Sequence, residues 1–284
     1  MKLVRFGPPG REKPGILDAD DRIRDLSKIV PDIAGETLSP AGLAKIKKAK
    51  IEKLPRVPGK PRLGPPVGNV RHFIGIGLNF SDHAAEVGMA LPKEPIIFAK
   101  APNCICGPND NIIAPKGSAK LDWEVELCIV IGRRARYLKS EAEAAKYIAG
   151  YTICNDVSER YFQIDRGGGQ WGKGKGAENF GPVGPWLVTP DEIKDVQNLT
   201  MHLEVNGEKR QHGSTRTMIF GVLNLVWYCS QFFVLEPGDL ITTGTPPGVA
   251  QGMKPEPKWL QPGDVVTLAI EGLGTQRQKV VPAR

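Results

Sequence analysis

Several features that would assign a protein to a common class are missing from this sequence. No apolar run approaches the ~18–20 residues needed to span a bilayer, and residues 1–9 lack the apolar stretch of a secretory signal peptide. We therefore expect a cytoplasmic protein with no membrane partner. No Gly-x-Gly-x-x-Gly follows a predicted strand, and no phosphate-binding loop occurs, so a nucleotide cofactor is not expected.

The cysteines lack the spacing of a structural site. There are five of them, without a Cys-x-x-Cys pair, which argues against a disulfide framework or a zinc site. Cys104 and Cys106 would share one side of a strand, so a thiol pair there remains open. Small buried thiols in a reducing compartment are the more common arrangement, and we expect that one.

Excess positive charge is confined to one segment. The formal net charge is +7, and residues 45–62 hold eight basic side chains against a single acid, Glu52. That segment contains no aromatic residue, unlike the surfaces typical of nucleic-acid binding. We expect a solvated helix face that runs into a linker, rather than a patch for polyanions, and no nucleic-acid partner.

Glycine and proline are abundant and aromatic residues are few. The 284 residues include 33 Gly and 25 Pro but only 7% aromatics, a composition that favours short strands joined by many turns. Residues 55–66 carry five prolines and cannot form a helix or a central strand. We therefore predict a small N-terminal domain with its linker over residues 1–66 and a larger domain over residues 67–284.

Strand patterns outnumber helix patterns along the chain. Helices are predicted near 81–89, 140–148, 157–165 and 216–231, and another begins at the capping pair Ser39-Pro40. Strands are predicted at 2–6, 15–18, 22–26, 71–77, 96–99, 123–131, 149–154, 184–188, 199–205, 239–242 and 264–270. The predicted fold class is α+β and β-dominated, with a large folded-over sheet and a few helices.

Two acids open a strongly apolar predicted strand. Glu124 and Glu126 begin the segment 123–131, and residues two apart project from the same face of a strand. Adjacent carboxylates repel unless a cation lies between them or one is protonated. A pair that faces solvent at the strand's start is the alternative, and the strand alone does not decide between the two.

A third acid favours a metal site. Asp156 follows the apolar segment 149–154, where it could also cap the helix predicted at 157. Three carboxylates at strand ends, without nearby thiolates, suit Mg²⁺, Mn²⁺ or Ca²⁺ rather than zinc or copper. Three protein ligands would leave positions open for water and substrate.

Two further patterns carry possible chemistry. His83 and Glu86 are three residues apart on a predicted helix, so the carboxylate can orient the imidazole as a general base, although a surface salt bridge is the commoner arrangement. The glycine-rich segment 167–185 contains Lys173 and Lys175, which could meet an anionic substrate or lie on an exposed linker. The hydroxyl-rich turn at 243–248 could hold a carboxylate.

Over residues 70–281 the sequence resembles the fumarylacetoacetate hydrolase family. Six motifs occur in the family's order: Asn-Phe-x-x-His-x-x-Glu (79–86), Glu-x-Glu (124–126), Asn-Asp-Val-Ser-Glu-Arg (155–160), Gly-Lys-Gly (174–176), Val-Asn-Gly-Glu (205–208) and Thr-Gly-Thr-Pro-x-Gly-Val (243–249). Gly-Gly-Gln-Trp (168–171) and the segment 181–189 are most similar to the branch that holds 2,4-diketo-3-deoxy-L-fuconate and L-rhamnonate hydrolases and proteins labelled ureidoglycolate lyase.

The resemblance implies a mixed β-sandwich roll with a small N-terminal domain and a homodimer. It implies Mg²⁺ or Mn²⁺ (with Ca²⁺ as a substitute in a crystal) held by residues matching Glu124, Glu126 and Asp156. It further implies a water-activating pair and a set of groups for the 2-oxo-acid end of a small substrate. The residues matching these roles are His83 and Glu86 for the pair, and Arg160, Gln163 and Thr245 for the substrate. Lys175 matches a lysine that binds the same end of the substrate and is the third expected catalytic residue.

The implied reaction is hydrolysis of a C–C bond in a 2,4-dioxo acid, giving pyruvate and a hydroxy acid such as lactate. A ureidoglycolate lyase, an oxaloacetate decarboxylase, a 2-oxo-acid isomerase and a non-catalytic binding module are the alternatives. Three departures from the family pattern bear on the substrate: Leu78 replaces an arginine of family decarboxylases, Tyr161 replaces an aspartate, and Glu178-Asn179 replaces Asp-Thr.

Overall fold

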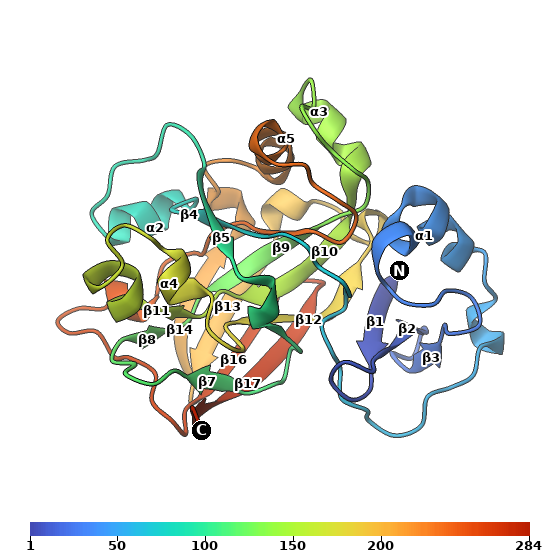
Figure 1. Cartoon of the computed structure of the whole chain (residues 1–284), viewed down its shortest axis with the longest axis horizontal. Coiled ribbons are helices and arrows are strands. Elements are labelled where there is room, and N and C mark those ends of the chain that lie inside the picture. Colours follow the sequence, from blue (N-terminus) through green and yellow to red (C-terminus); the bar gives the residue numbers. More distant parts are fainter.

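Three β-sheets of unequal size form the framework of the fold (Figure 1). The computed structural model describes residues 1–284. The largest sheet has ten strands. Nine of them lie in the order β3 (Ile23–Asp25), β2 (Lys13–Leu17), β1 (Lys2–Phe6), β12 (Gly181–Val188), β10 (Ile148–Asn155), β9 (Val125–Ile131), β15 (Leu240–Thr242), β4 (Phe73–Gly77) and β5 (Ile96–Lys100). The tenth strand, β6 (Ile105–Cys106), pairs with β12. Pairing is mixed, because β4 and β15 are parallel and most other pairs are antiparallel.

A second sheet of five strands packs against the first. Its order is β14 (Glu208–Ser214), β13 (Thr200–Val205), β16 (Val265–Ile270), β17 (Gly274–Pro282) and β7 (Ile112–Ala114). Strands β13, β16 and β17 contact β9, β10 and β12. The third sheet is the short pair of β11 (Ser158–Glu159) and β8 (Leu121–Asp122). The predicted β-dominated α+β fold is confirmed.

The helices are short and few. They are α1 (Pro40–Lys47), α2 (Ser81–Glu86), α3 (Glu141–Ala144), α4 (Gly172–Lys175) and α5 (Val222–Phe232), with a π-helical turn over Tyr161–Asp165. Short 3₁₀ turns occupy Gly35–Leu38, Ile51–Lys53, Pro102–Cys104, Ala145–Tyr147, Pro190–Glu192, Val196–Asn198, Thr215–Thr217 and Ala250–Gly252. The start of α1 agrees with the sequence prediction, since the N–H of Gly42 donates to Ser39 Oγ at 3.1 Å.

The apolar composition of β9 and β10 explains why these strands lie in the middle of the sheet. Every residue of β9 is buried, and its run Val-Glu-Leu-Cys-Ile-Val-Ile is apolar on both faces apart from Glu126. Such continuous apolar runs are typical of strands covered on both sides. Because β9 and β10 are neighbours in the middle of the sheet, polar residues at their ends are held on a rigid, buried support.

Two predicted helices are wrong over their first residues. The helix predicted at 216–231 begins only at Val222, after the 3₁₀ turn at Thr215–Thr217. The segment 157–165 begins as strand β11, and helical conformation starts only at Tyr161. The reason is Glu159, whose carboxylate accepts hydrogen bonds from the backbone N–H groups of Ala119 and Lys120, at 2.8 and 2.6 Å, and of Phe162, at 2.7 Å. These bonds tie β11 to the segment before β8.

The N-terminal segment is continuous with the main sheet. Strand β1 pairs with β12, and Leu3, Leu26 and Ile46 belong to the same cluster of buried apolar side chains as the residues of β9 and β10. In the basic segment, Lys47 pairs with Asp191, while Arg62 pairs with Asp110 and Glu12. No helix is both long and apolar enough to cross a bilayer. The division into domains at residue 66 stays a prediction.

These contacts predict how the two parts unfold. Because residues 1–66 share a sheet and a core with the rest of the chain, we expect one cooperative transition in urea, with the same midpoint by tryptophan fluorescence and by circular dichroism. Two separated transitions, with the earlier one confined to residues 1–66 in hydrogen exchange, would contradict this expectation.

Candidate active site

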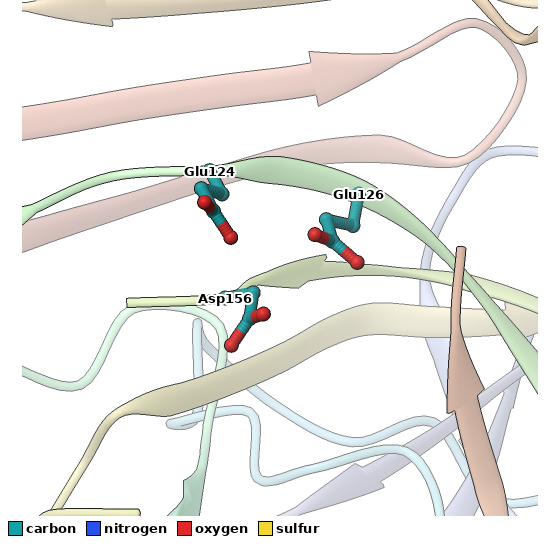
Figure 2. Close-up of side chains that lie close together, drawn as sticks. All are labelled: Glu124, Glu126 and Asp156. Carbon is teal, nitrogen blue, oxygen red and sulfur yellow. The ribbon is translucent and has the colours of Figure 1, made fainter. Parts of the chain in front are cut away.

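Three carboxylates converge at the ends of the central strands β9 and β10. Glu124 immediately precedes β9, Glu126 lies within it, and Asp156 follows β10 (Figure 2). The register pairs Cys154 with Glu126, and the N–H of Asp156 donates to the carbonyl oxygen of Glu124 at 2.9 Å. One oxygen of each carboxylate lies within 4.8 Å of the other two. We call Glu124, Glu126 and Asp156 the carboxylate triad.

Buried cations surround two members of the triad. Lys175 Nζ lies 2.5 Å from Glu124 Oε2 and 2.7 Å from Asp156 Oδ2. Arg160 Nη2 donates to Glu124 Oε1 at 2.5 Å, and Lys100 Nζ donates to Asp156 Oδ1 at 2.5 Å. Burial disfavours ionisation of Glu124, but Arg160 and Lys175 outweigh it and hold the pKa of Glu124 below its usual range.

Glu126 is the member of the triad without a cationic partner. It is 1% exposed, and its Oε2 accepts a hydrogen bond from the N–H of Gly244 at 2.9 Å. Burial, followed by the negative charges of Asp156 and Glu124, raises its pKa well above the usual range. A buried, unbalanced carboxylate beside two others is the environment in which a divalent cation replaces repulsion by attraction. The donor set therefore fits Mg²⁺ or Mn²⁺.

An imidazole–carboxylate pair lies beside the triad. On α2, His83 Nδ1 is 2.8 Å from Glu86 Oε2, and Glu86 Oε1 accepts a hydrogen bond from the N–H of Gly248 at 2.8 Å. With Nδ1–H donating to Glu86, the lone pair of His83 Nε2 is free to accept a proton. We call these two residues the His83–Glu86 dyad.

A cavity of about 140 Å³ joins the dyad to the triad. Most of the residues predicted from the sequence line it: His83, Glu124, Glu126, Arg160, Gln163, Lys175 and Thr245. Glu86 and Asp156 lie behind this lining, in contact with His83 and Lys175 respectively. Lys173 is exposed and does not line the cavity.

Two of the predicted substrate-binding groups already have protein partners. Gln163 Oε1 accepts a hydrogen bond from Arg160 Nη1 at 3.0 Å. Thr245 Oγ1 donates to the carbonyl of Val125 at 2.9 Å and accepts from Gln211 Nε2 at 2.8 Å. Their orientation is fixed by these bonds, so both present defined groups to the cavity.

Sequence reasoning missed two buried residues of the site. Asp122, fully buried, accepts from Arg160 Nε at 2.9 Å and from the N–H of Ala250 at 2.7 Å, so it holds Arg160 and the turn after Gly248 together. Lys100 also donates to the carbonyl oxygens of Lys175 and Phe180, at 2.6 and 3.1 Å. Asp122 was visible as the first residue of Asp-Trp-Glu-Val-Glu, whereas Lys100 gave no signal beyond ending an apolar strand.

All five cysteines are free and buried, as expected. Cys104 and Cys106 form no disulfide. Burial raises the pKa of Cys229 to about 12, which keeps that thiol protonated. None of the five thiols lines the cavity.

Comparison with known proteins assigns the family. The model of the fumarylacetoacetate (FAA) hydrolase C-terminal family matches residues 72–281. The chain is therefore a member of the fumarylacetoacetate hydrolase family and an enzyme of that family. A protein of Burkholderia multivorans is 59% identical over 284 residues, covering all of both chains, and its name describes it only as a hydrolase, without a substrate.

Solved structures of the family share the whole fold. A fumarylacetoacetate hydrolase from Exiguobacterium antarcticum is 36% identical with a TM-score of 0.88, and both chains are covered completely. A 2-hydroxyhepta-2,4-diene-1,7-dioate isomerase from Mycobacterium marinum is 33% identical with a TM-score of 0.78, covering 99% of this chain and 98% of that one. A maleylpyruvate hydrolase from Sphingobium sp. SYK-6, in complex with manganese(II) and pyruvate, is 26% identical with a TM-score of 0.82 over both full chains.

The asymmetry within the triad predicts unequal effects of two substitutions on stability. In EDTA, Glu124→Gln should lower the free energy of unfolding by about 3 kcal/mol, because it breaks a buried pair with Arg160 and Lys175. Glu126→Gln should change it by less than about 1 kcal/mol, because the amide oxygen still accepts from Gly244 and no ion pair is lost. Urea unfolding of both variants measures the difference.

The same variants test whether the triad binds a divalent cation. Mg²⁺ or Mn²⁺ should raise the melting temperature of the wild-type protein and leave that of Glu126→Gln unchanged. Equal losses of stability in EDTA, or a metal-induced shift that survives in Glu126→Gln, would contradict this picture of the triad.

Proposed function

We propose that this protein is a divalent-metal-dependent hydrolase that cleaves a C–C bond of a 2,4-dioxo acid, releasing pyruvate and a second carboxylic acid. The observation that carries the proposal is the placement of the His83–Glu86 dyad and two carboxylates of the triad around one small cavity. The hydrolase name of the B. multivorans relative and the pyruvate and manganese in the Sphingobium structure support it.

Glu124, Glu126 and Asp156 would hold the cation, which we propose to be Mg²⁺ or Mn²⁺. Such an ion supplies Lewis acidity toward the 2-oxo-carboxylate of the substrate. The protein's own cations add to this, because Arg160 and Lys175 line the same cavity. Fixed positive groups at the buried end of the cavity stabilise the negative charge that develops as the bond breaks.

The dyad would activate the water. His83 Nε2 takes one proton from water while Glu86 holds the imidazole by its Nδ1–H. The oxygen of that water attacks C4 of the substrate, and the C3–C4 bond breaks. Its electron pair passes into the enolate of pyruvate, which takes up at C3 the proton held by His83. One water is consumed, and one pyruvate and one carboxylic acid are released.

The sequence resemblance favours a particular substrate within this class. It points to a 2,4-diketo-3-deoxy-L-sugar acid of the L-rhamnonate or L-fuconate type, with lactate as the second product for a 6-deoxy sugar. A homodimer and a cytoplasmic location belong to the same proposal.

A 2-oxo-acid isomerase is the second candidate. The similarity to the M. marinum isomerase favours it, and such a reaction would need the cation but no attacking water. Product mass separates the two, because hydrolysis splits the substrate and adds one water, whereas isomerisation leaves the mass unchanged. Decarboxylation of oxaloacetate or cleavage of ureidoglycolate would instead release CO₂ or urea.

The experiment is a substrate panel assayed with Mg²⁺ or Mn²⁺ and scored for pyruvate, CO₂ and urea by mass spectrometry. Pyruvate should form from a 2,4-dioxo acid, and EDTA should abolish its formation. His83→Ala should lower kcat at least about 100-fold, because it removes the general base. His212→Ala is the matched control, because His212 is exposed and lies outside the cavity.

Two results would count against the proposal. One is pyruvate formation at the wild-type rate by His83→Ala, with its metal-induced melting shift retained. The other is a panel in which a 2,4-dioxo acid changes only its isomeric form, which would favour the isomerase.

A further inference from the structure

The cavity differs in chemistry between its inner end and its mouth. At the inner end, Glu124, Arg160 and Lys175 are 5%, 6% and 2% exposed. Two other residues of the lining, Met89 and Ile164, are 54% and 51% exposed and therefore lie at the mouth. A substrate with its 2-oxo-carboxylate on the buried charged groups would extend its other end toward these apolar side chains.

The apolar side chains of the mouth come from separate segments. Met89 follows α2, Ile164 lies on the π-helical turn, and Trp171 immediately precedes α4. The indole of Trp171 packs against Phe98, with ring centroids 5.4 Å apart, and both rings line the cavity. Covering half-exposed apolar groups with an alkyl chain removes apolar surface from water and is favourable.

No arginine or lysine of the cavity lining is free to meet a second carboxylate at this mouth. Arg160 and Lys175 are the members of that class in the lining, and both are paired with Glu124 at the inner end. Arg166 lies outside the lining, with its guanidinium 5.8 and 5.3 Å from the rings of Tyr161 and Phe162. A carboxylate placed against Met89 and Ile164 would lose part of its hydration shell without meeting a free cation of the lining, which is unfavourable.

From this polarity we propose that the substrate is a monocarboxylate whose acyl end, beyond C4, is uncharged and terminates in an alkyl group. The inference rests on the proposed function and narrows it. It separates this chain from the M. marinum isomerase, whose named substrate is a dioate. A methyl-terminated deoxy-sugar acid and a simple acylpyruvate both satisfy it.

A matched pair of substrates tests the proposal. The first is 2,4-dioxoheptanoate, and the second is 2,4-dioxoheptanedioate, which has the same chain with a carboxylate in place of the terminal methyl group. With the Mg²⁺-loaded enzyme, kcat/KM should be at least about tenfold higher for the first, since an unpaired polar group at a binding site is strongly discriminated against.

Supplying the missing cation should weaken or abolish the preference. Ile164→Arg or Met89→Arg, each at a half-exposed position that tolerates a long side chain, should reduce the ratio of the two kcat/KM values by about tenfold, through a new ion pair with the dioate. Leu91→Arg is the control, because Leu91 is 57% exposed, lies in the same loop as Met89 and does not line the cavity. It carries the same added charge, and its ratio should remain that of the wild type.

The outcomes distinguish the inferred substrate preference from the proposed hydrolase function. Cleavage of the dioate at a kcat/KM equal to or above that of the monocarboxylate overturns the inference and leaves the proposed hydrolysis standing. An equal change of the ratio in Leu91→Arg and in both mouth variants also overturns it, since general charge would then explain the preference. Failure to cleave these two substrates and every other 2,4-dioxo acid of the panel, with metal binding intact, overturns the proposed function itself.

Discussion

The buried carboxyl group of Glu126, which has no cationic partner in the protein, is the constraint on which the site depends. Four carboxyl groups, those of Asp122 and the triad, lie together with three cations, Arg160, Lys175 and Lys100. No positive charge is left to balance Glu126, whose pKa is raised in consequence. Ionising a buried carboxyl group that has no partner costs free energy, whereas burying apolar side chains does not. A divalent ion removes this cost, so stability and chemistry depend on the same interaction.

The rest of the molecule can be understood as support for that cluster. Strands β9 and β10 are apolar along their length, which fixes their place in the sheet and the register that opposes Asp156 to Glu124. The turn after β15 supplies the N–H of Gly244 to Glu126 and that of Gly248 to Glu86. Triad and dyad are thereby positioned by one turn, although they come from distant parts of the sequence.

Features of the fold and the site could be predicted from the sequence where they depend on residues close together in the chain. Local patterns predicted the two apolar strands β9 and β10. They also predicted that Glu124 and Glu126, at i, i+2, share one face of a strand, and that His83 and Glu86, at i, i+3, share one face of a helix. Lys100 was not predicted as part of the site, because its three acceptors come from residues 56 to 80 positions away and leave no local pattern. The early part of the helix predicted at 157–165 was wrong for the same reason, since Glu159 bonds to the chain near residue 120. The polar strands β14 and β17 were missed because Gln211, Gln276 and Gln278 are buried by pairing of their amides rather than by hydrophobicity.

The most direct test of the account is anomalous diffraction from crystals of the wild-type protein grown with Mn²⁺. The account predicts one manganese peak per chain, bound by oxygens of Glu124, Glu126 and Asp156, with His83 facing the same cavity. A triad without a manganese peak, or with Lys175 still bridging Glu124 and Asp156 at saturating Mn²⁺, would contradict it.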